Sequence, residues 1–89
     1  MNETTIAQGF RLLKAGCPEV ELRYQNEHKI VPVAISLGRL WDMAHKLYRA
    51  EDLGPAWEFP TELTSNELIE ALVQALEDYY TQQNNNGLR

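Results

Sequence analysis

The sequence has a single cysteine, Cys17, which leaves no partner for an internal disulfide. It has no long apolar run, so none of its 89 residues predicts a transmembrane helix. The first ten residues, MNETTIAQGF, lack the basic and apolar regions of a signal peptide. We therefore expect a cytoplasmic protein that binds no membrane.

Basic residues are missing from positions 50–88, where eight acidic residues give a net charge of −8. Positions 1–49 hold seven basic and five acidic residues, a net charge of +2. Nucleic-acid binding rests mainly on neutralising phosphates, so this distribution makes nucleic acid an unlikely partner. Basic side chains of the first half, among them Arg39 and Lys46, leave a weak nucleic-acid binder as a further alternative.

Catalytic and metal-binding motifs are also missing. The soft ligands Cys17, His28 and His45 fit no zinc spacing. The acidic pairs at 51–52 and 77–78 are adjacent in sequence and look solvated, which is unsuited to general acid–base work. No glycine-rich phosphate loop occurs. We expect a protein that is not an enzyme and uses no cofactor or metal.

The pattern of apolar residues predicts a small α+β fold in the order α-β-β-α-α. We expect one domain over residues 1–83, followed by a flexible polar tail at 84–89. The predicted elements are a helix at 3–15, strands at 19–25 and 29–35, helices at 37–50 and 64–81, and a loop at 51–63.

The first predicted helix carries Ile6, Phe10 and Leu13 on one apolar face, and Gly16 is a natural left-handed stop. Gly9 lies inside this helix and is expected to be a tolerated, exposed glycine, with a close helix contact as the alternative.

The two strands are expected to form an antiparallel hairpin that packs on the helices at 37–50 and 64–81. Pro32 cannot donate a backbone hydrogen bond, so it should blunt the outer edge of the second strand. The outer edge of the first strand is open to another strand. The expected register pairs Val20 with Val33, Leu22 with Val31 and Tyr24 with Lys29.

The last helix starts with a capping box, in which Thr64 and Glu67 bond to each other's backbone N–H groups. Its core face is expected to consist of Leu68, Leu72, Leu76 and Tyr79, and Ile69, Val73 and Tyr80 extend the same apolar face. Its opposite, acidic face consists of Glu70, Glu77 and Asp78, and is expected to be dispensable for folding.

These features favour a small protein-interaction module, either a homodimer or an adaptor for another protein. It would use apolar helix surface and the aromatic loop at 51–63. The alternative is an acidic inhibitor that mimics nucleic acid and blocks a basic nucleic-acid-binding protein, of the phage or defence type. The candidate partner-binding residues are Trp57, Phe59, Glu58, Glu62, Glu70, Glu77, Asp78 and Tyr80.

Overall fold

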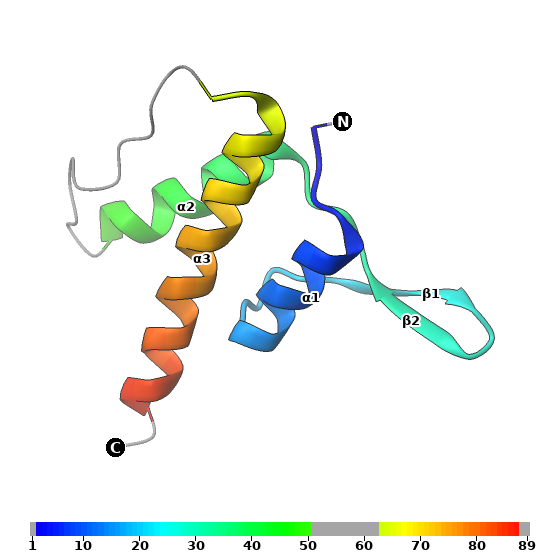
Figure 1. The fold of residues 1–89 in the computed structure, drawn as a ribbon. Helices are drawn as coiled ribbons and strands as arrows, with labels where there is room; N and C mark the ends of the chain where they lie inside the picture. Colours follow the sequence, from blue (N-terminus) through cyan, green and yellow to red (C-terminus); the bar gives the residue numbers. More distant parts are fainter. Residues whose placement is uncertain (1, 51–62, 88–89) are drawn as a thin grey trace.

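The computed structural model describes residues 2–50 and 63–87 and has the expected α+β order (Figure 1). Three helices and a two-stranded antiparallel hairpin follow in the order α-β-β-α-α. The elements are α1 (Ile6–Ala15), β1 (Leu22–Asn26), β2 (Lys29–Pro32), α2 (Leu37–Ala50) and α3 (Ser65–Gly87). The predicted loop at 51–63, with Trp57 and Phe59, lies outside the described residues except for Leu63.

Helix α1 begins three residues later than predicted, because residues 2–4 pair with the chain that follows β2. The backbone N–H of Thr4 donates to the Ile35 carbonyl at 2.9 Å. Thr5 then caps the helix: Gln8 N–H donates to its hydroxyl at 3.1 Å, and the Gln8 side chain accepts from Thr5 N–H. The predicted stop is confirmed, since Gly16 has a left-handed backbone with φ +98°.

The face of α1 that enters the core differs from the expected one. Its buried residues are Gly9, Leu12 and Ala15, whereas Ile6, Phe10 and Leu13 are exposed to solvent. Gly9 is buried against the ring of Pro32, so the prediction that it is an exposed, tolerated glycine was wrong. Because glycine has no Cβ atom, the Pro32 ring can approach this helix closely, which periodicity alone does not reveal.

The hairpin register differs by one residue from the predicted one. The structure pairs Leu22 with Pro32, Arg23 with Val31 and Tyr24 with Ile30. An irregularity between Tyr24 and Asn26 lets Asn26 pair with Lys29, which moves the turn to residues 27–28. The Asn26 carboxamide accepts the His28 N–H at 2.9 Å, and this local turn bond changes the strand pairing.

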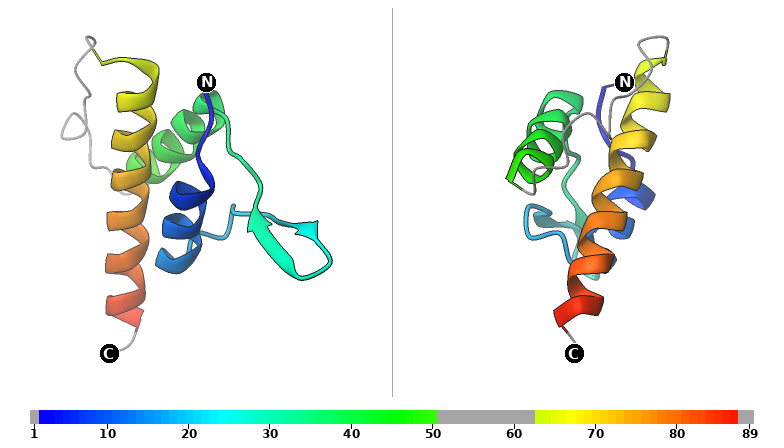
Figure 2. Two further views of the ribbon diagram at one scale, coloured as in Figure 1. Left: turned by 45° about the vertical axis from the view of Figure 1, so that its right-hand side comes forward. Right: turned by 90° about the vertical axis from the view of Figure 1, so that its left-hand side faces the viewer.

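Helices α1 and α3 lie side by side and run in the same direction, and α2 crosses α3 (Figures 1 and 2). The parallel direction follows from their contacts, because Gln8 reaches Glu70 and Ala15 meets Asn84 further along both helices. The core between the elements contains Leu12, Cys17, Ile35, Leu40, Met43, Ala44, Ile69, Leu72, Val73 and Leu76.

The hairpin contacts α1 through β2 and projects away from α2 and α3 (Figures 1 and 2). The prediction that it packs on the helices at 37–50 and 64–81 was therefore wrong. The physical reason is that α1 takes the place beside α3, and the Gly9–Pro32 contact holds β2 against α1. Within the described part of the chain, no helix is long and apolar enough to cross a bilayer.

Helix α3 has the predicted capping box: Glu67 N–H donates to the Thr64 hydroxyl, and Thr64 N–H donates to the Glu67 carboxylate, both at 3.2 Å. Its fully buried positions are Ile69, Leu72, Val73 and Leu76, which all belong to the predicted apolar face, whereas Leu68 and Tyr79 at the margin of that face are half-buried. The helix also continues beyond the predicted end, to Gly87. Flexibility of residues 84–89 stays a prediction.

Candidate protein-interaction surface

One face of the projecting hairpin is apolar and exposed. Leu22 and Tyr24 of β1 lie opposite Pro32 and Ile30 of β2, so these four side chains share a face. Leu22, Tyr24 and Ile30 are 50%, 75% and 47% exposed. We call these three side chains the hairpin face. A surface of large apolar side chains on a projecting element is typical of a binding site rather than of a core.

A second exposed apolar surface lies on α1. Ile6, Phe10 and Leu13 recur at spacings of four and three, which places them along one stripe of the helix. Pro32 of β2 contacts Gly9 of the same helix, so the stripe and the hairpin face flank one junction. We call these three residues the α1 stripe.

The two edges of the hairpin differ. Beyond Pro32, which has no N–H, the chain following β2 is paired with residues 2–4: Leu37 N–H donates to the Asn2 carbonyl at 2.7 Å. The outer edge of β1 meets no other strand among the described residues, and every residue of β1 is exposed. The prediction of one blunted and one open edge is thus confirmed for this part of the chain.

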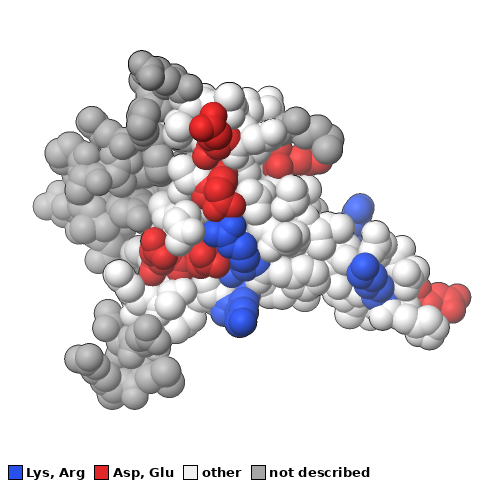
Figure 3. Space-filling model, in the orientation of Figure 1, with Lys and Arg blue, Asp and Glu red and all other residues white. Residues whose placement is uncertain are grey.

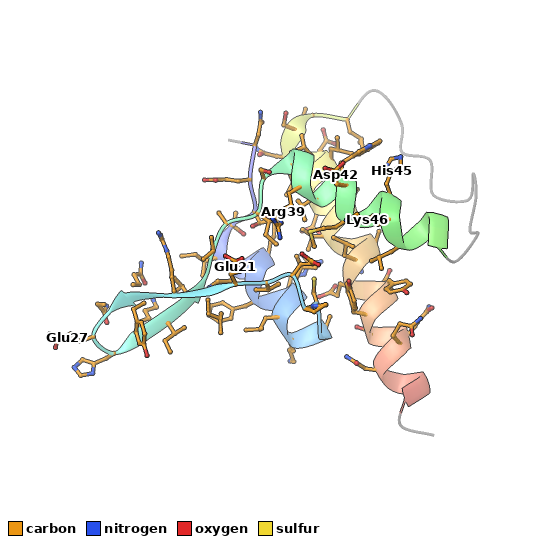
Figure 4. The ribbon with its side chains drawn as sticks, turned by 180° about the vertical axis from the view of Figure 1, so that it is seen from behind. Glu21, Glu27, Arg39, Asp42, His45 and Lys46 are labelled. Carbon is orange, nitrogen blue, oxygen red and sulfur yellow. The ribbon has the colours of Figure 1, made fainter. Side chains whose placement is uncertain are left out.

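A small polar cleft of about 270 Å³ lies between α2, α3 and the residues before β1. Arg39 forms an ion pair with Glu19 at 3.0 Å beside it, and Asp42 and Lys46 also line it. Figure 4 shows Glu21 near Arg39 at the base of the hairpin, whereas Glu27 lies at its tip. The mixed charges at this cleft select no single class of ligand.

The thiol and phenol beside the cleft are poor nucleophiles. Burial raises the pKa of the Cys17 thiol above its ordinary value, and Tyr80 lies next to it. Burial is also the main reason that the pKa of Tyr80 rises to about 12. Both groups are therefore protonated at neutral pH, and a protonated thiol does not attack an electrophile. The part of the chain that the structure describes holds no cluster of three metal-ligating side chains.

Two of the predicted acidic partner-binding residues are used inside the fold. The Arg11 guanidinium of α1 donates to Glu70 at 3.0 Å and to Glu77 at 3.2 Å on α3. Figure 3 shows basic and acidic side chains in contact on this face of the molecule. The hydrogen bond from Arg11 holds the pKa of Glu70 below its usual range. Two carboxylates of this acidic face, Glu70 and Glu77, thus connect α1 to α3, and the expectation that folding does not require the face stays a prediction.

The remaining predicted site residues are dispersed. Asp78 is exposed and accepts a hydrogen bond from the Gln74 side chain at 3.0 Å. Tyr80 is half-buried and packs against the core. Trp57, Phe59, Glu58 and Glu62 lie outside the described residues.

Sequence reasoning missed the hairpin face as an exposed surface, because it assigned Leu22 to the core through the incorrect register. The signal that was available is Asn26, whose side chain favours a turn starting at that residue. A turn at residues 27–28 is not enough to predict that Tyr24 pairs with Ile30. The register shift between Tyr24 and Asn26 must be predicted as well. No family model, curated protein or solved structure matches the chain.

Proposed function

We propose that this protein is a non-enzymatic interaction module that binds a protein partner through the hairpin face. The single observation that carries the proposal is the exposure of Leu22, Tyr24 and Ile30 on a projecting hairpin. The α1 stripe supports it as a second apolar surface next to the same junction. Tyrosine and large aliphatic residues provide the anchors of many protein interfaces.

Solvent exposure of the hairpin face has a cost in free energy. Fully burying a leucine or isoleucine side chain contributes about 1.5–3 kcal/mol. Each half-exposed side chain of the hairpin face therefore leaves on the order of 1 kcal/mol ungained in the isolated chain. A two-stranded hairpin is also marginally stable without a covering element. A partner that covered this face would stabilise both the complex and the hairpin itself.

The alternative, an acidic inhibitor, receives less support from the described residues. Glu70 and Glu77 both bind Arg11, so one of their two negative charges is compensated within the protein. Weak nucleic-acid binding is also less supported, since Arg11 and Arg39 each have an acidic partner. Proteins recognise phosphates with basic side chains that neutralise the phosphate charge and release its counterions. Basic side chains that are already in ion pairs with carboxylates are less available for this.

The test measures association of the intact protein and its dependence on the hairpin face. Wild-type protein, Ile30→Ser and the matched control Gln25→Ser are compared by light scattering, alone and after capture of partners from native extract. Gln25 is an exposed polar residue of β1. We expect wild type and Gln25→Ser to form a stoichiometric complex, with a second protein or with itself, and Ile30→Ser to lose it.

Circular dichroism of each variant shows whether the fold is kept, which is expected because the mutated side chains are exposed. The proposal fails if wild-type protein stays alone under all these conditions. It also fails if a folded Ile30→Ser variant associates as tightly as wild type.

A further inference from the structure

The open edge of β1 has a defined set of free hydrogen-bonding groups. Val33 N–H donates to the Glu21 carbonyl at 2.8 Å, so the Glu21 carbonyl points toward β2. Backbone groups alternate in direction along a strand, so those of Arg23 also point toward β2. The N–H and C=O groups of Leu22 and Tyr24 consequently point outward, along the edge that no described strand covers.

This edge can pair with itself. When two β1 strands meet antiparallel around a two-fold axis at Leu22, each Leu22 exchanges N–H···O=C bonds with its counterpart. This pairing requires that the N–H and C=O groups of Leu22 point outward, as they do here. The hairpin of each molecule would then extend into a four-stranded sheet across the two copies.

The side chains beside Leu22 are complementary in this arrangement. Glu21 of each copy lies opposite Arg23 of the other, so two opposite-charge pairs flank the axis. Both residues are exposed, and neither has an ion-pair partner among the described residues. On the other face Tyr24 lies opposite Val20 of the second copy, and Leu22 faces Leu22, so apolar side chains meet apolar side chains.

A different register is less favourable. An axis at Tyr24 also matches the direction of the free backbone groups, but it places Arg23 opposite Gln25 and Leu22 opposite Asn26. That arrangement has no opposite-charge pair and sets an apolar side chain against a polar one. An axis at Arg23 also matches the free backbone groups and pairs Leu22 with Tyr24 of the second copy, but it sets arginine against arginine. The axis at Leu22 is therefore the one that combines apolar pairs with opposite-charge pairs.

We propose that a second copy of this chain binds the open edge of β1, antiparallel and about a two-fold axis at Leu22. This inference goes beyond the proposed function, because the second copy binds the edge of β1 and not the hairpin face. A strand from another protein on the same edge is the competing outcome of the test. The hairpin face remains on one side of the combined sheet, where the apolar surfaces of the two copies become continuous.

The first experiment exchanges the charges and measures dimerisation by sedimentation equilibrium. Glu21→Arg alone sets arginine against arginine, and Arg23→Glu alone sets glutamate against glutamate, so each should weaken the dimer about tenfold. A mixture of the two variants should recover wild-type affinity, because every pair in the mixed dimer again joins opposite charges. The double variant Glu21→Arg/Arg23→Glu should also recover it.

The second experiment fixes the register by cross-linking. Leu22→Cys places two thiols across the axis, with Cα atoms about 5.5 Å apart, which a disulfide can bridge. Tyr24→Cys is the matched control. In the proposed dimer position 24 lies opposite Val20 of the second copy, so the two introduced thiols are four residues apart along the strand and too distant for a disulfide. Mild oxidation should cross-link Leu22→Cys and leave Tyr24→Cys monomeric.

The inference is overturned if wild type is monomeric at micromolar concentrations, if the mixed variants fail to complement, or if Tyr24→Cys cross-links in place of Leu22→Cys. A monomer that still binds another protein through Ile30 would overturn only this inference and would support the proposed function. A monomer that binds nothing would overturn both.

Discussion

Gly9 of α1 lies so close to Pro32 of β2 that a Cβ atom at position 9 would come within 2.6 Å of the proline Cγ. This contact joins the hairpin to the helices. Gly9→Ala should therefore destabilise the protein by about 1–3 kcal/mol, although alanine is the better helix former by about 1 kcal/mol. Chemical denaturation measures the change in the free energy of unfolding.

Gly38 provides the matched control for that prediction. It lies in the first turn of α2, and a Cβ built there meets nothing within 4 Å. Gly38→Ala should leave stability unchanged or raise it by up to about 1 kcal/mol. Equal effects of the two substitutions would contradict the importance of the Gly9–Pro32 contact.

Arg11 connects α1 to α3 through Glu70 and Glu77. Arg11→Met should lower stability at pH 7 by about 1 kcal/mol, a modest value because the Glu70 side chain is 47% exposed. Lys14→Met is the control: it removes a charge from the same helix, where Lys14 forms no ion pair with a described residue. We expect it to change stability by a few tenths of a kcal/mol.

The effect of Arg11→Met should also depend on pH. Because Arg11 lowers the pKa of Glu70 in the folded protein, this carboxylate stabilises the fold fully above its unfolded pKa of about 4.3. The stabilisation is lost as the pH falls through the lower, folded pKa. Thermal melts of wild type and Arg11→Met should converge between pH 5 and pH 2. An unchanged difference over that range would count against the ion pairs.

Asn84 connects the ends of α1 and α3. Its side-chain amide donates to the Ala15 carbonyl at 2.6 Å, where α1 has unpaired carbonyl groups. Asn84→Ala should cost about 1 kcal/mol. Asn84→Asp should cost more, since it places a carboxylate against the negative end of a helix.

Gln83→Ala serves as the control on the neighbouring exposed residue. If both Asn84 variants unfold at the same denaturant concentration as Gln83→Ala, the end of α3 does not hold α1. The flexible tail that the sequence predicts at 84–89 would then be the better description.

Cys17 should react slowly with thiol reagents. It is 3% exposed, and burial raises its pKa, so both access and thiolate concentration are reduced. We expect modification at pH 8 to be at least about tenfold slower in the folded protein than in denaturant. Because the pKa is raised, the reaction rate should keep rising with pH beyond the ordinary thiol pKa, where the rate for a free thiol levels off. Fast modification of the folded protein would place the thiol at the surface.

The order and type of the elements could be predicted because they follow from local chemistry. The capping box of Thr64 and Glu67 and the left-handed stop at Gly16 involve only neighbouring residues. The α2 helix also has its predicted bounds, and Ser36 just before it accepts the Arg39 N–H with its hydroxyl at 3.2 Å. Such signals do not depend on the rest of the fold.

The packing partners could not be predicted in the same way. Apolar periodicity shows that a helix has an apolar stripe, but α1 buries Leu12 and leaves Phe10 exposed. The choice depends on the contact of Gly9 with Pro32, 23 residues further along the chain. The ion pairs of Arg11 with α3 span 59 and 66 residues, and composition cannot place them. The hairpin face was missed for a related reason, since one bulge exchanges the two faces of a strand.

The side-by-side packing of α1 and α3 sets the order in which this chain can fold. Leu12 near the start needs Leu72 and Leu76 near the other end to close the same core. During synthesis α1 and β2 emerge before α3, so α1 can contact β2 early, but it can pack against α3 only after residue 76 has left the ribosome. Closing contacts over such separations costs chain entropy, which slows folding relative to a bundle of sequential neighbours. The core face of α1 is therefore buried later than its contact with the hairpin.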